Sequence, residues 1–445
     1  MSALYNPFGD KRLSELTEED LQQLIPRGVA EGHYVEYKST APSAAKIAKS
    51  VSAFANTHGG WLFLGLEADE HTNLPTRVPG LDLSTYGNLP DTIRHAVVAH
   101  LDPQPGYEDR CVPLSDGRIV VVVRTPEGDS PPYIHSDGRM YRRHGAGSDP
   151  VFEKDRHTVD QLYVKARKVH EQFRDFAALP WQMSKAQSNS TTGWLELYIM
   201  PEHPGDLADD AVWKAVETSP TEHLAWWSSP VEWKSADDQE VVLTVSAPFD
   251  QFVATVSGYC VSQAPQTPDP SFLPLVVDVT YTGATRTFIP MQALSEDALE
   301  QAHEELMKDL GDSAWQVRPF DGHALCRGAL IMLMKCAQYA HEQGATGGLR
   351  TKVRLCNCWK ALPCFPGKPY KTIVDALGWP ISRCSEHEIP PALADRAFAA
   401  TEVKTPGLYG IGMLSPILQA LGIPYPYVGE ITGICAVSWK DACAG

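Results

Sequence analysis

Apolar residues recur at helical spacing in several segments of the N-terminal part of the chain. In one segment Ile47, Val51 and Phe54 share a face, and Gly59 and Gly60 end it. In another, Thr17 precedes three acidic residues, as an N-cap residue does at the start of a helix. The pattern predicts helices over residues 17–25, 43–57, 88–101 and 155–176.

Short apolar runs between these segments predict strands. Trp61–Leu66 is continuously apolar, which is typical of a strand buried on both faces. Further strands are predicted at His33–Tyr37 and Arg118–Val123, and Tyr133–Arg143 is predicted to form a hairpin. Helices and strands mixed in this order predict an α/β (α+β) domain built on a mixed sheet.

A polar segment, residues 183–193, is the predicted linker between an N-terminal domain with a trailing helix, residues 1–182, and a C-terminal α+β domain, residues 194–445. Tryptophan use changes there: one of the eleven lies before residue 150, and six lie between Trp181 and Trp233. The second domain is predicted to be strand-rich at first (195–200, 240–247, 252–261, 275–289) and then helical (295–311, 323–342).

Composition places the chain among ordinary globular proteins, with 43% hydrophobic and 21% charged residues. The most apolar stretch, Ala329–Met334, is far shorter than a bilayer requires, and the N-terminus lacks the pattern of a signal peptide. We therefore expect a cytoplasmic protein without membrane contact. The formal charge of −17 argues against a protein that coats duplex DNA nonspecifically, because phosphate binding depends on Lys and Arg.

The first candidate for chemistry is the segment Glu31–Lys38. On a strand, Glu36 and Lys38 point to one face, and Glu31 joins them only if the chain bends near Gly32. Carboxylates beside an ammonium group can hold a divalent cation and orient a water molecule or a phosphate. The alternative is a surface strand that carries a solvated Glu–Lys pair.

Two further segments, together with this one, resemble a known family. Ser52–Leu66 reads SAFANTHGGWLFLGL, a helix, a turn and an apolar strand, and Tyr141–Ser148 ends a proline-containing hairpin with a Tyr-Arg-Arg run. The three segments, in this order and at this spacing, are similar to the Schlafen/Alba-type (AlbA_2) nucleic-acid-interaction domain. The resemblance covers about residues 15–150 and implies the fold of that domain.

In Schlafen-type ribonucleases, a triad of acids binds Mg or Mn and RNA such as tRNA is cleaved. The resemblance implies Glu31, Glu36 and Lys38 as catalytic residues, with Glu31 and Glu36 as metal ligands. The third acid of the family is expected at Ala68, so Glu67 or Asp69 would have to replace it. Lys38 is then expected to contact the scissile phosphate.

Residues expected to bind nucleic acid lie in the same three segments: Lys46, Lys49, Asn56, Gly59, Gly60, Arg142 and Arg143. Backbone amides at the glycine turn could receive a phosphate, and an arginine could clamp one. The alternatives are a tight helix-to-strand connection for the glycines and a local acid as partner of an arginine.

Two functions follow. The first is a metal-dependent nuclease, a candidate endoribonuclease, that acts on RNA such as tRNA or on single-stranded nucleic acid in antiphage defence. The second is a non-catalytic nucleic-acid-binding transcriptional regulator with a C-terminal sensing or targeting domain. Schlafen nucleases close two similar lobes into a clamp, and one lobe is present here, so a clamp would need a homodimer. Cys356, Cys358, Cys364 and Cys384 lack the spacing of a common zinc site, and we favour ordinary thiols there.

Overall fold

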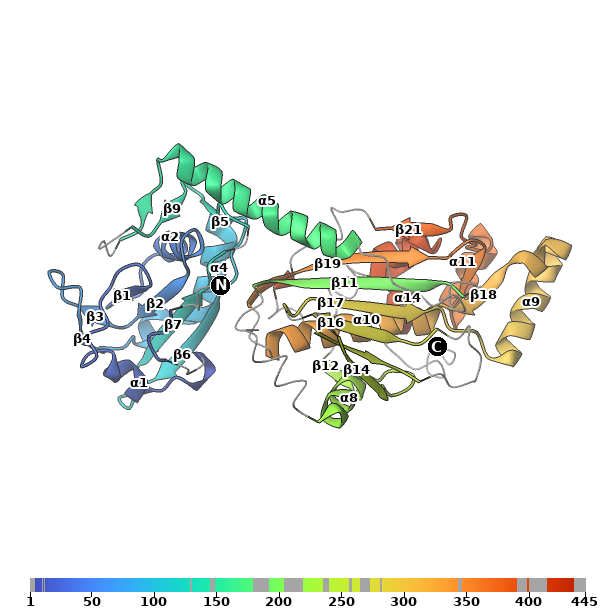
Figure 1. Cartoon of the computed structure of the whole chain (residues 1–445), viewed down its shortest axis with the longest axis horizontal. Helices are drawn as coiled ribbons and strands as arrows, with labels where there is room; N and C mark the ends of the chain where they lie inside the picture. Colours follow the sequence, from blue (N-terminus) through green and yellow to red (C-terminus); the bar gives the residue numbers. More distant parts are fainter. Residues whose placement is uncertain are drawn as a thin grey trace. The chain divides into compact units, whose positions relative to one another are not determined.

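The computed structural model describes residues 5–9, 11, 13–128, 130–144, 149–178, 192–203, 219–234, 240–255, 258–264, 273–280, 282–342, 346–389, 398–399 and 414–435. The chain divides into two compact units (Figure 1), residues 1–176 with 346–348, and residues 177–345 with 349–445. The predicted linker at 183–193 lies almost wholly outside the described residues, which resume at Thr192. Each unit has a hydrophobic core of its own.

A four-stranded mixed sheet, in the order β1-β2-β7-β6, forms the centre of the first unit. β1 (Val35–Lys38) runs parallel to β2 (Gly60–Leu64), and β2 pairs antiparallel with β7 (Ile119–Thr125). β6 (Glu108–Pro113) pairs antiparallel with β7. β2 is buried at every position, as its continuously apolar sequence predicts.

Different layers cover the two faces of this sheet. α2 (Ala44–Ala55) and α4 (Leu89–His100) pack on one face, where Leu62 of β2 meets Phe54. On the other face, apolar residues of η1 (Leu13–Glu15) and α1 (Glu18–Gln23) form a hydrophobic cluster with Trp61 of β2. Glu36 is in register with Leu62, so the alternation along β1 places Glu36 on the face that α2 covers.

Short elements complete the first unit. Three two-stranded ribbons join β3 (Glu67–Ala68) with β4 (Pro75–Arg77), β5 (Leu101–Asp102) with β8 (Ile134–His135), and β9 (Tyr141–Arg142) with β10 (Val151–Phe152). The helices are α3 (Leu83–Tyr86) and the long α5 (Arg156–Ala178). The β9–β10 ribbon lies against α2, and it therefore brings the end of the predicted hairpin close to β1.

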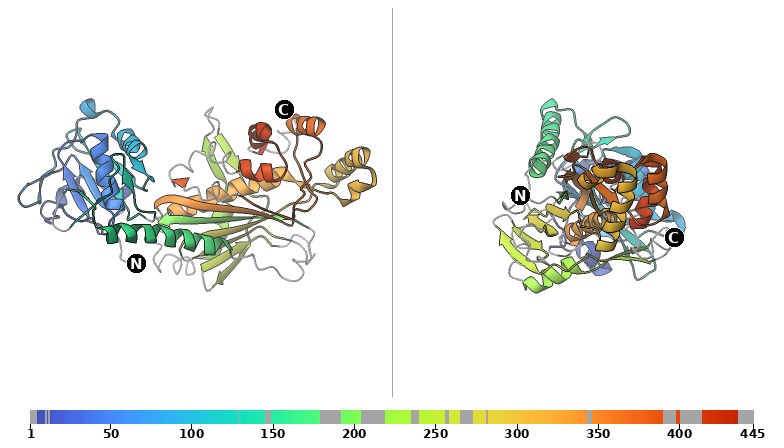
Figure 2. Two further views of the ribbon diagram at one scale, coloured as in Figure 1. Left: turned by 90° about the horizontal axis from the view of Figure 1, so that it is seen from above. Right: turned by 90° about the vertical axis from the view of Figure 1, so that its right-hand side faces the viewer.

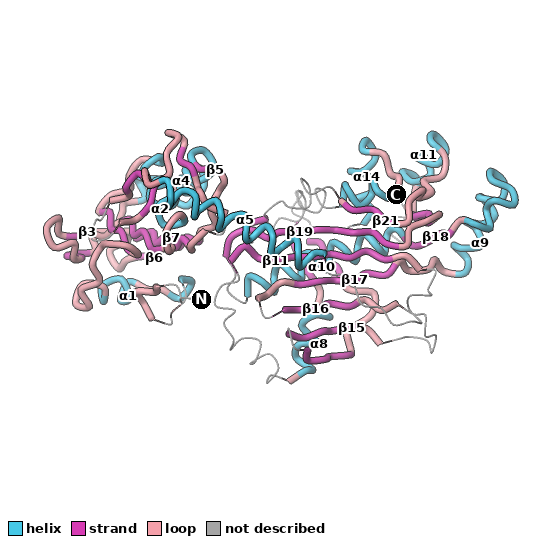
Figure 3. Tube along the Cα trace, turned by 45° about the horizontal axis from the view of Figure 1, so that its top comes forward, coloured by secondary structure: helices cyan, strands magenta, loops and turns pink. Residues whose placement is uncertain are grey.

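The second unit is built on a large sheet whose main path is β14-β15-β16-β17-β11-β19-β21 (Figure 3). The helix α10 (Gly322–Glu342) lies along one face of it (Figure 2), and its apolar side chains share a core with the strands. The strands of the path are β14 (Gln251–Thr255), β15 (Gly258–Ser262), β16 (Val276–Thr280), β17 (Thr285–Pro290), β11 (Trp194–His203), β19 (Thr346–Cys356) and β21 (Glu386–Glu388).

The remaining elements of the second unit lie around this sheet. The strands are β12 (Val231–Lys234), β13 (Glu240–Leu243), β18 (Arg318–Asp321), β20 (Ala361–Cys364) and β22 (Phe398–Ala399). The helices are α8 (Pro220–Ser228), α9 (Glu296–Leu310), η2 (Gly311–Gln316), α11 (Lys368–Leu377), η4 (Tyr425–Tyr427) and α14 (Val428–Cys435). No helix among the described residues has the length and apolarity that a membrane span requires.

The predicted α/β (α+β) class, with a mixed sheet in the N-terminal domain, is confirmed. Two details of the second domain were wrong. Residues 252–261 and 275–289, each predicted as one strand, are two antiparallel hairpins, β14–β15 and β16–β17. The long strand β19 lies in the half that was predicted to be helical. Local patterns did not predict it, because β19 is stabilised by pairing with β11 and β21, which are distant in the sequence.

Candidate nucleic-acid interface

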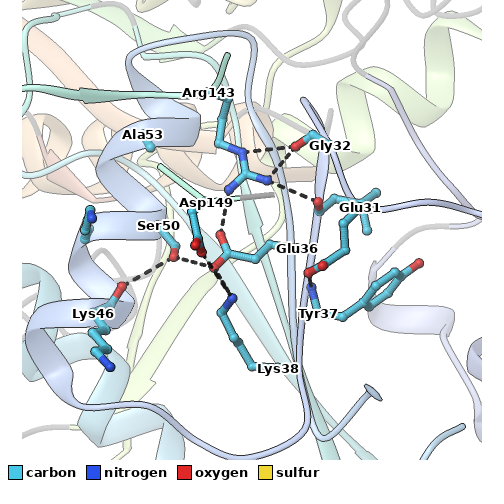
Figure 4. A network of polar contacts seen from close by, with 12 residues as sticks. Glu31, Gly32, Glu36, Tyr37, Lys38, Lys46, Ser50, Ala53, Arg143 and Asp149 are labelled. Atoms are coloured by element: carbon cyan, nitrogen blue, oxygen red, sulfur yellow. Dashed lines mark hydrogen bonds and ion pairs between the residues drawn. The ribbon is translucent and has the colours of Figure 1, made fainter. Parts of the chain in front are cut away.

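Glu36 lies within β1, and three side chains surround its carboxylate (Figure 4). Its Oε1 accepts a hydrogen bond from Oγ of Ser50 at 3.0 Å and lies 3.0 Å from Nζ of Lys38. Its Oε2 lies 2.8 Å from Nη1 of Arg143. Both oxygens of this carboxylate are therefore engaged inside the fold.

The Arg143 side chain is fully buried and holds the segment that leads into β1. Nε and Nη2 donate hydrogen bonds to the carbonyl oxygen of Gly32, and Nη2 also reaches that of Val35 at 3.3 Å. The guanidinium lies 4.8 Å from the centroid of the Phe54 ring. Burial lowers the pKa of Arg143, and the charge of Glu36 opposes that shift. The pair is thus a buried cation and a buried anion that compensate each other.

The chain bends near Gly32, so that the Glu31 side chain lies against β1. Such a bend was the condition for Glu31 to approach Glu36 and Lys38. Its Oε1 accepts a hydrogen bond from the backbone N–H of Tyr37 at 2.6 Å, and the N–H of Gly32 donates to the carbonyl oxygen of Val35. Burial raises the pKa of the Glu31 carboxyl, although the Tyr37 hydrogen bond and Lys38 oppose this. Glu31 therefore sits beside the Glu36 cluster and caps an N–H of β1 (Figure 4).

Lys38 is the residue of this cluster that reaches solvent, with 33% of its side chain exposed. Burial opposes its charge and would lower the pKa of Lys38, but the carboxylates of Glu36, Glu31 and Asp149 together raise it. The exposed carboxylate of Asp149 also lies 3.8 Å from its Nζ. Lys38 is therefore positively charged at neutral pH, ion-paired with Glu36 and partly exposed to solvent.

The candidate third acids do not join this cluster. Glu67 forms an ion pair with Arg77 at 2.6 Å across the β3–β4 ribbon. Asp69 accepts hydrogen bonds from the backbone and hydroxyl of Thr72, which lower its pKa. Within the described residues, no three His, Cys, Asp or Glu side chains approach closely enough to hold a metal ion. With Glu36 also engaged by Arg143, this donor set does not fit the expected Mg or Mn.

The turn residues are used within the fold. The side-chain amide of Asn56 donates to the carbonyl oxygens of Tyr133 and Tyr141, and its oxygen accepts the N–H of Tyr133. The N–H of Gly59, expected to be free for a phosphate, instead donates to the carbonyl oxygen of Phe54. Asn56 therefore connects the helix to the closing segment, and the Gly59 N–H closes the turn at the end of the helix, which is the structural alternative for these residues.

Gly60 has a packing reason to be glycine. A Cβ atom at this position would lie 2.2 Å from a ring carbon of Phe54 and 2.8 Å from the carbonyl oxygen of Tyr34. The first strand residue after the turn is thus pressed against the helix that precedes it. The close approach serves the contact between α2 and β2 and leaves Gly60 buried.

Arg142 has a local acid as its partner. Its Nη1 lies 3.1 Å from Oε2 of the buried Glu153, and its Nε donates to the carbonyl oxygen of Asn56. Neither arginine of the predicted clamp is therefore free, since Arg143 is paired with Glu36. The sequence had left a local acid open as the partner of one arginine, and Arg142 has such a partner in Glu153, whereas the acid that pairs with Arg143 lies 107 residues away.

Lys46 and Lys49 differ from these arginines because neither forms an ion pair among the described residues. Lys46 is exposed, and Lys49 places its Nζ 4.5 Å from the ring centroid of Tyr141. Both lie on α2 within one turn of Ser50, the residue that binds Glu36. Lys38 of β1 and Lys46 of α2 lie on either side of Ser50 and Glu36 (Figure 4), and Lys49 belongs to the same helix as Lys46.

Comparison with known proteins finds one family model that matches the first unit. Residues 31–152 match the family model described as Schlafen, AlbA_2. The first unit contains a Schlafen AlbA_2 domain. The match begins at Glu31, at the start of the cluster, and ends at Phe152, in β10. It indicates a nucleic-acid-related function for this unit.

Solved structures also resemble parts of the chain. One is the N-terminal domain of a protein described as related to the ATP-dependent DNA helicase RecG, from Nitrosomonas europaea, with 21% identity over 32% of this chain and 97% of that chain and a TM-score of 0.22. Another is the DIP2311 protein from Corynebacterium diphtheriae, with 14% identity over 73% of this chain and 80% of that chain and a TM-score of 0.21. No curated protein matches the chain.

Sequence reasoning missed two members of the Schlafen AlbA_2 cluster, Ser50 and Asp149. Ser50 lies one helical turn after Lys46 and faces β1, so the periodicity of α2 could have identified it. Asp149 lies beyond the Tyr-Arg-Arg run, and no pattern in the sequence connects it with Lys38. The pairing of Arg143 with Glu36 also had no local signal, because 107 residues separate the two.

The cysteines considered for zinc lie in the second unit, outside the Schlafen AlbA_2 domain. Cys356 and Cys358 are buried, Cys364 is half-buried and Cys384 is exposed. Burial raises the pKa of Cys358 and of Cys364 to about 12.

Proposed function

We propose that the Schlafen AlbA_2 domain binds nucleic acid through phosphate contacts of Lys38, Lys46 and Lys49, without metal-dependent cleavage. The observation that carries this proposal is the ion pair between Glu36 and Arg143. Arg143 supplies the positive charge beside Glu36 that a divalent cation would otherwise supply, and it does so from a fully buried position. The family match supports the nucleic-acid part of the proposal.

The three lysines suit phosphate binding in different ways, because Lys38 is ion-paired with Glu36 but 33% exposed, whereas Lys46 and Lys49 form no ion pair among the described residues. Lys38 keeps its charge beside Glu36, and Lys46 and Lys49 have no acidic partner among the described residues. Since the whole chain carries a formal charge of −17, attraction of nucleic acid must come from such a local group. Binding of this kind is expected to weaken steeply as salt rises.

The competing function is a metal-dependent endoribonuclease with Glu31, Glu36 and Lys38 as catalytic residues. It would require Glu36 to leave Arg143 and a third acid to approach from another segment. Glu67 and Asp69 have other partners in this structure. One experiment distinguishes this function from the proposed one.

The experiment incubates the full chain with labelled tRNA, ribosomal RNA and single-stranded DNA, in Mn or in EDTA. We expect binding that EDTA leaves unchanged and no cleavage. Replacement of Lys46 and Lys49 together by Ala should weaken binding. The matched control is Arg27→Ala, which removes an exposed charge that follows α1.

Cleavage that requires Mn and disappears in Lys38→Ala would overturn the proposal and favour the nuclease. Equal binding by wild type, the double lysine variant and Arg27→Ala would show that Lys46 and Lys49 do not form the interface. Light scattering with and without bound RNA would show whether two copies join, as a clamp of two lobes would require.

A further inference from the structure

Phe152 of β10 is an exposed aromatic residue at the end of the Schlafen AlbA_2 domain. Its side chain is 37% exposed, and Val151 beside it is 46% exposed. Phe152 belongs to none of the hydrophobic clusters found among the described residues. Packing in a core therefore does not account for a large apolar ring at this position.

Positive side chains flank this ring. The guanidinium of Arg139 lies 5.5 Å from its centroid and Nζ of Lys154 lies 5.9 Å from it. Both side chains are exposed. Both cations lie over the ring in cation–π contact, and more than a third of Phe152 stays open to solvent.

The ring also continues the lysine surface of α2. Phe152 is in register with Tyr141 across the β9–β10 ribbon, so the two side chains lie on the same face. Nζ of Lys49 lies 4.5 Å from the Tyr141 ring. Lys49 therefore contacts the ring that pairs with Phe152 across the ribbon, and Arg139 and Lys154 contact Phe152 itself.

An exposed ring beside available cations has the chemistry of a single-strand binding surface. Bases stack on aromatic side chains while positive groups follow the backbone, and base identity matters little. A duplex stacks its bases against one another and presents phosphates instead, so a surface ring has no base to meet. An exposed ring of this kind favours unpaired over paired nucleic acid, whereas lysines that contact phosphates do not discriminate between them.

We propose that Phe152 stacks an unpaired base of single-stranded nucleic acid, and that Lys49, Arg139 and Lys154 contact the phosphates on either side of that base. This inference rests on the proposed function and deepens it, because it names single strands as the preferred class. Stacking on Phe152 is expected to depend little on base identity, and the phosphate contacts of the cations are expected to weaken as salt rises.

The test measures binding of a labelled 20-nucleotide oligouridylate and of a 20-base-pair RNA duplex to the full chain. Phe152→Ala should weaken binding of the single strand roughly 5- to 150-fold, the range for loss of one stacked base. Its effect on the duplex should stay within about twofold, because the phosphate contacts remain. The matched control is Tyr163→Ala on α5, which removes another exposed ring, 46% exposed, from the same unit.

A second variant, Phe152→Trp, keeps an aromatic face and should retain single-strand binding. Its added tryptophan fluorescence should be quenched when oligouridylate binds. If Phe152→Ala binds the single strand as wild type does, or loses both substrates equally, the stacking role is overturned and the proposed function stands. If wild type binds neither substrate, the proposed function itself fails.

Discussion

The carboxylate of Glu36 and the guanidinium of Arg143 are 2.8 Å apart, and their side chains are 1% and 0% exposed. One comes from the second residue of β1 and the other from the residue after β9, so the pair joins the two ends of the Schlafen AlbA_2 domain. Ser50 and Lys38 complete the shell of Glu36. Arg143 therefore neutralises the Glu36 carboxylate inside the fold. The positive charge proposed to bind ligands belongs to the lysines at the edge of this cluster.

Loss of either member of this pair should destabilise the first unit strongly. Arg143→Ala leaves the Glu36 carboxylate buried without its main partner, and breaking such a pair costs about 3–5 kcal/mol. Urea denaturation followed by circular dichroism measures the change as an earlier first transition. The control is Arg77→Ala, which breaks the exposed pair with Glu67 and should change stability by at most about 1 kcal/mol. Equal effects of the two variants would contradict the role given to burial.

The carboxyl of Glu31 should make the first unit less stable as pH rises. Its pKa is raised above the ordinary value of 4.5 by burial, so the folded state holds the proton more tightly than the unfolded state. Its contribution is fully present below about pH 4.5 and is lost as pH rises through the higher pKa of the folded state.

Thermal unfolding of Glu31→Gln measures this effect. The amide oxygen can still accept the Tyr37 N–H, and the variant should lose the decline between pH 4.5 and the pKa of the folded state. The exposed Glu70→Gln serves as control and should follow the wild-type curve. A Glu31→Gln curve that coincides with wild type across this range would show that Glu31 does not titrate as stated.

Gly60 should tolerate no side chain. A Cβ would overlap the Phe54 ring and approach the Tyr34 carbonyl, so Gly60→Ala must displace α2 from β2 and should cost roughly 1–3 kcal/mol or more. Gly32→Ala is the matched control, because a Cβ there meets nothing within 4 Å. Melting temperatures of the two variants make the comparison, and a similar small loss in both would refute the packing argument.

The salt dependence of nucleic-acid binding should show whether Lys46 and Lys49 contact phosphates. Each phosphate contact of a single strand contributes a slope of about 0.7 in log Kd against log salt. Removal of Lys46 and Lys49 should therefore lower the slope by about 1.4 if both bind phosphate. Titrations at several salt concentrations provide the slope, and Arg27→Ala should leave it unchanged. A double variant with the wild-type slope would place the phosphates elsewhere.

Local patterns determined much of the first unit. The alternation along His33–Lys38 placed Glu36 and Lys38 on one face, and the spacing of Ile47, Val51 and Phe54 predicted α2. These features depend on neighbours in the sequence, whose periods of two and 3.6 residues reflect backbone geometry. The apolar run of β2 likewise indicated its burial on both faces.

Only the tertiary structure decided what the polar residues do. Arg143 lies 107 residues from Glu36 in the chain, and the ribbon that brings it back to β1 has no local signature. Glu67 and Asp69 were plausible ligands by position, but the β3–β4 ribbon and its loop engage them with Arg77 and Thr72. A buried charge takes whichever compensating partner the packing brings near, and the packing depends on contacts between distant segments. The sequence therefore determined which residues form the cluster around β1, and the fold determined that Arg143 closes it.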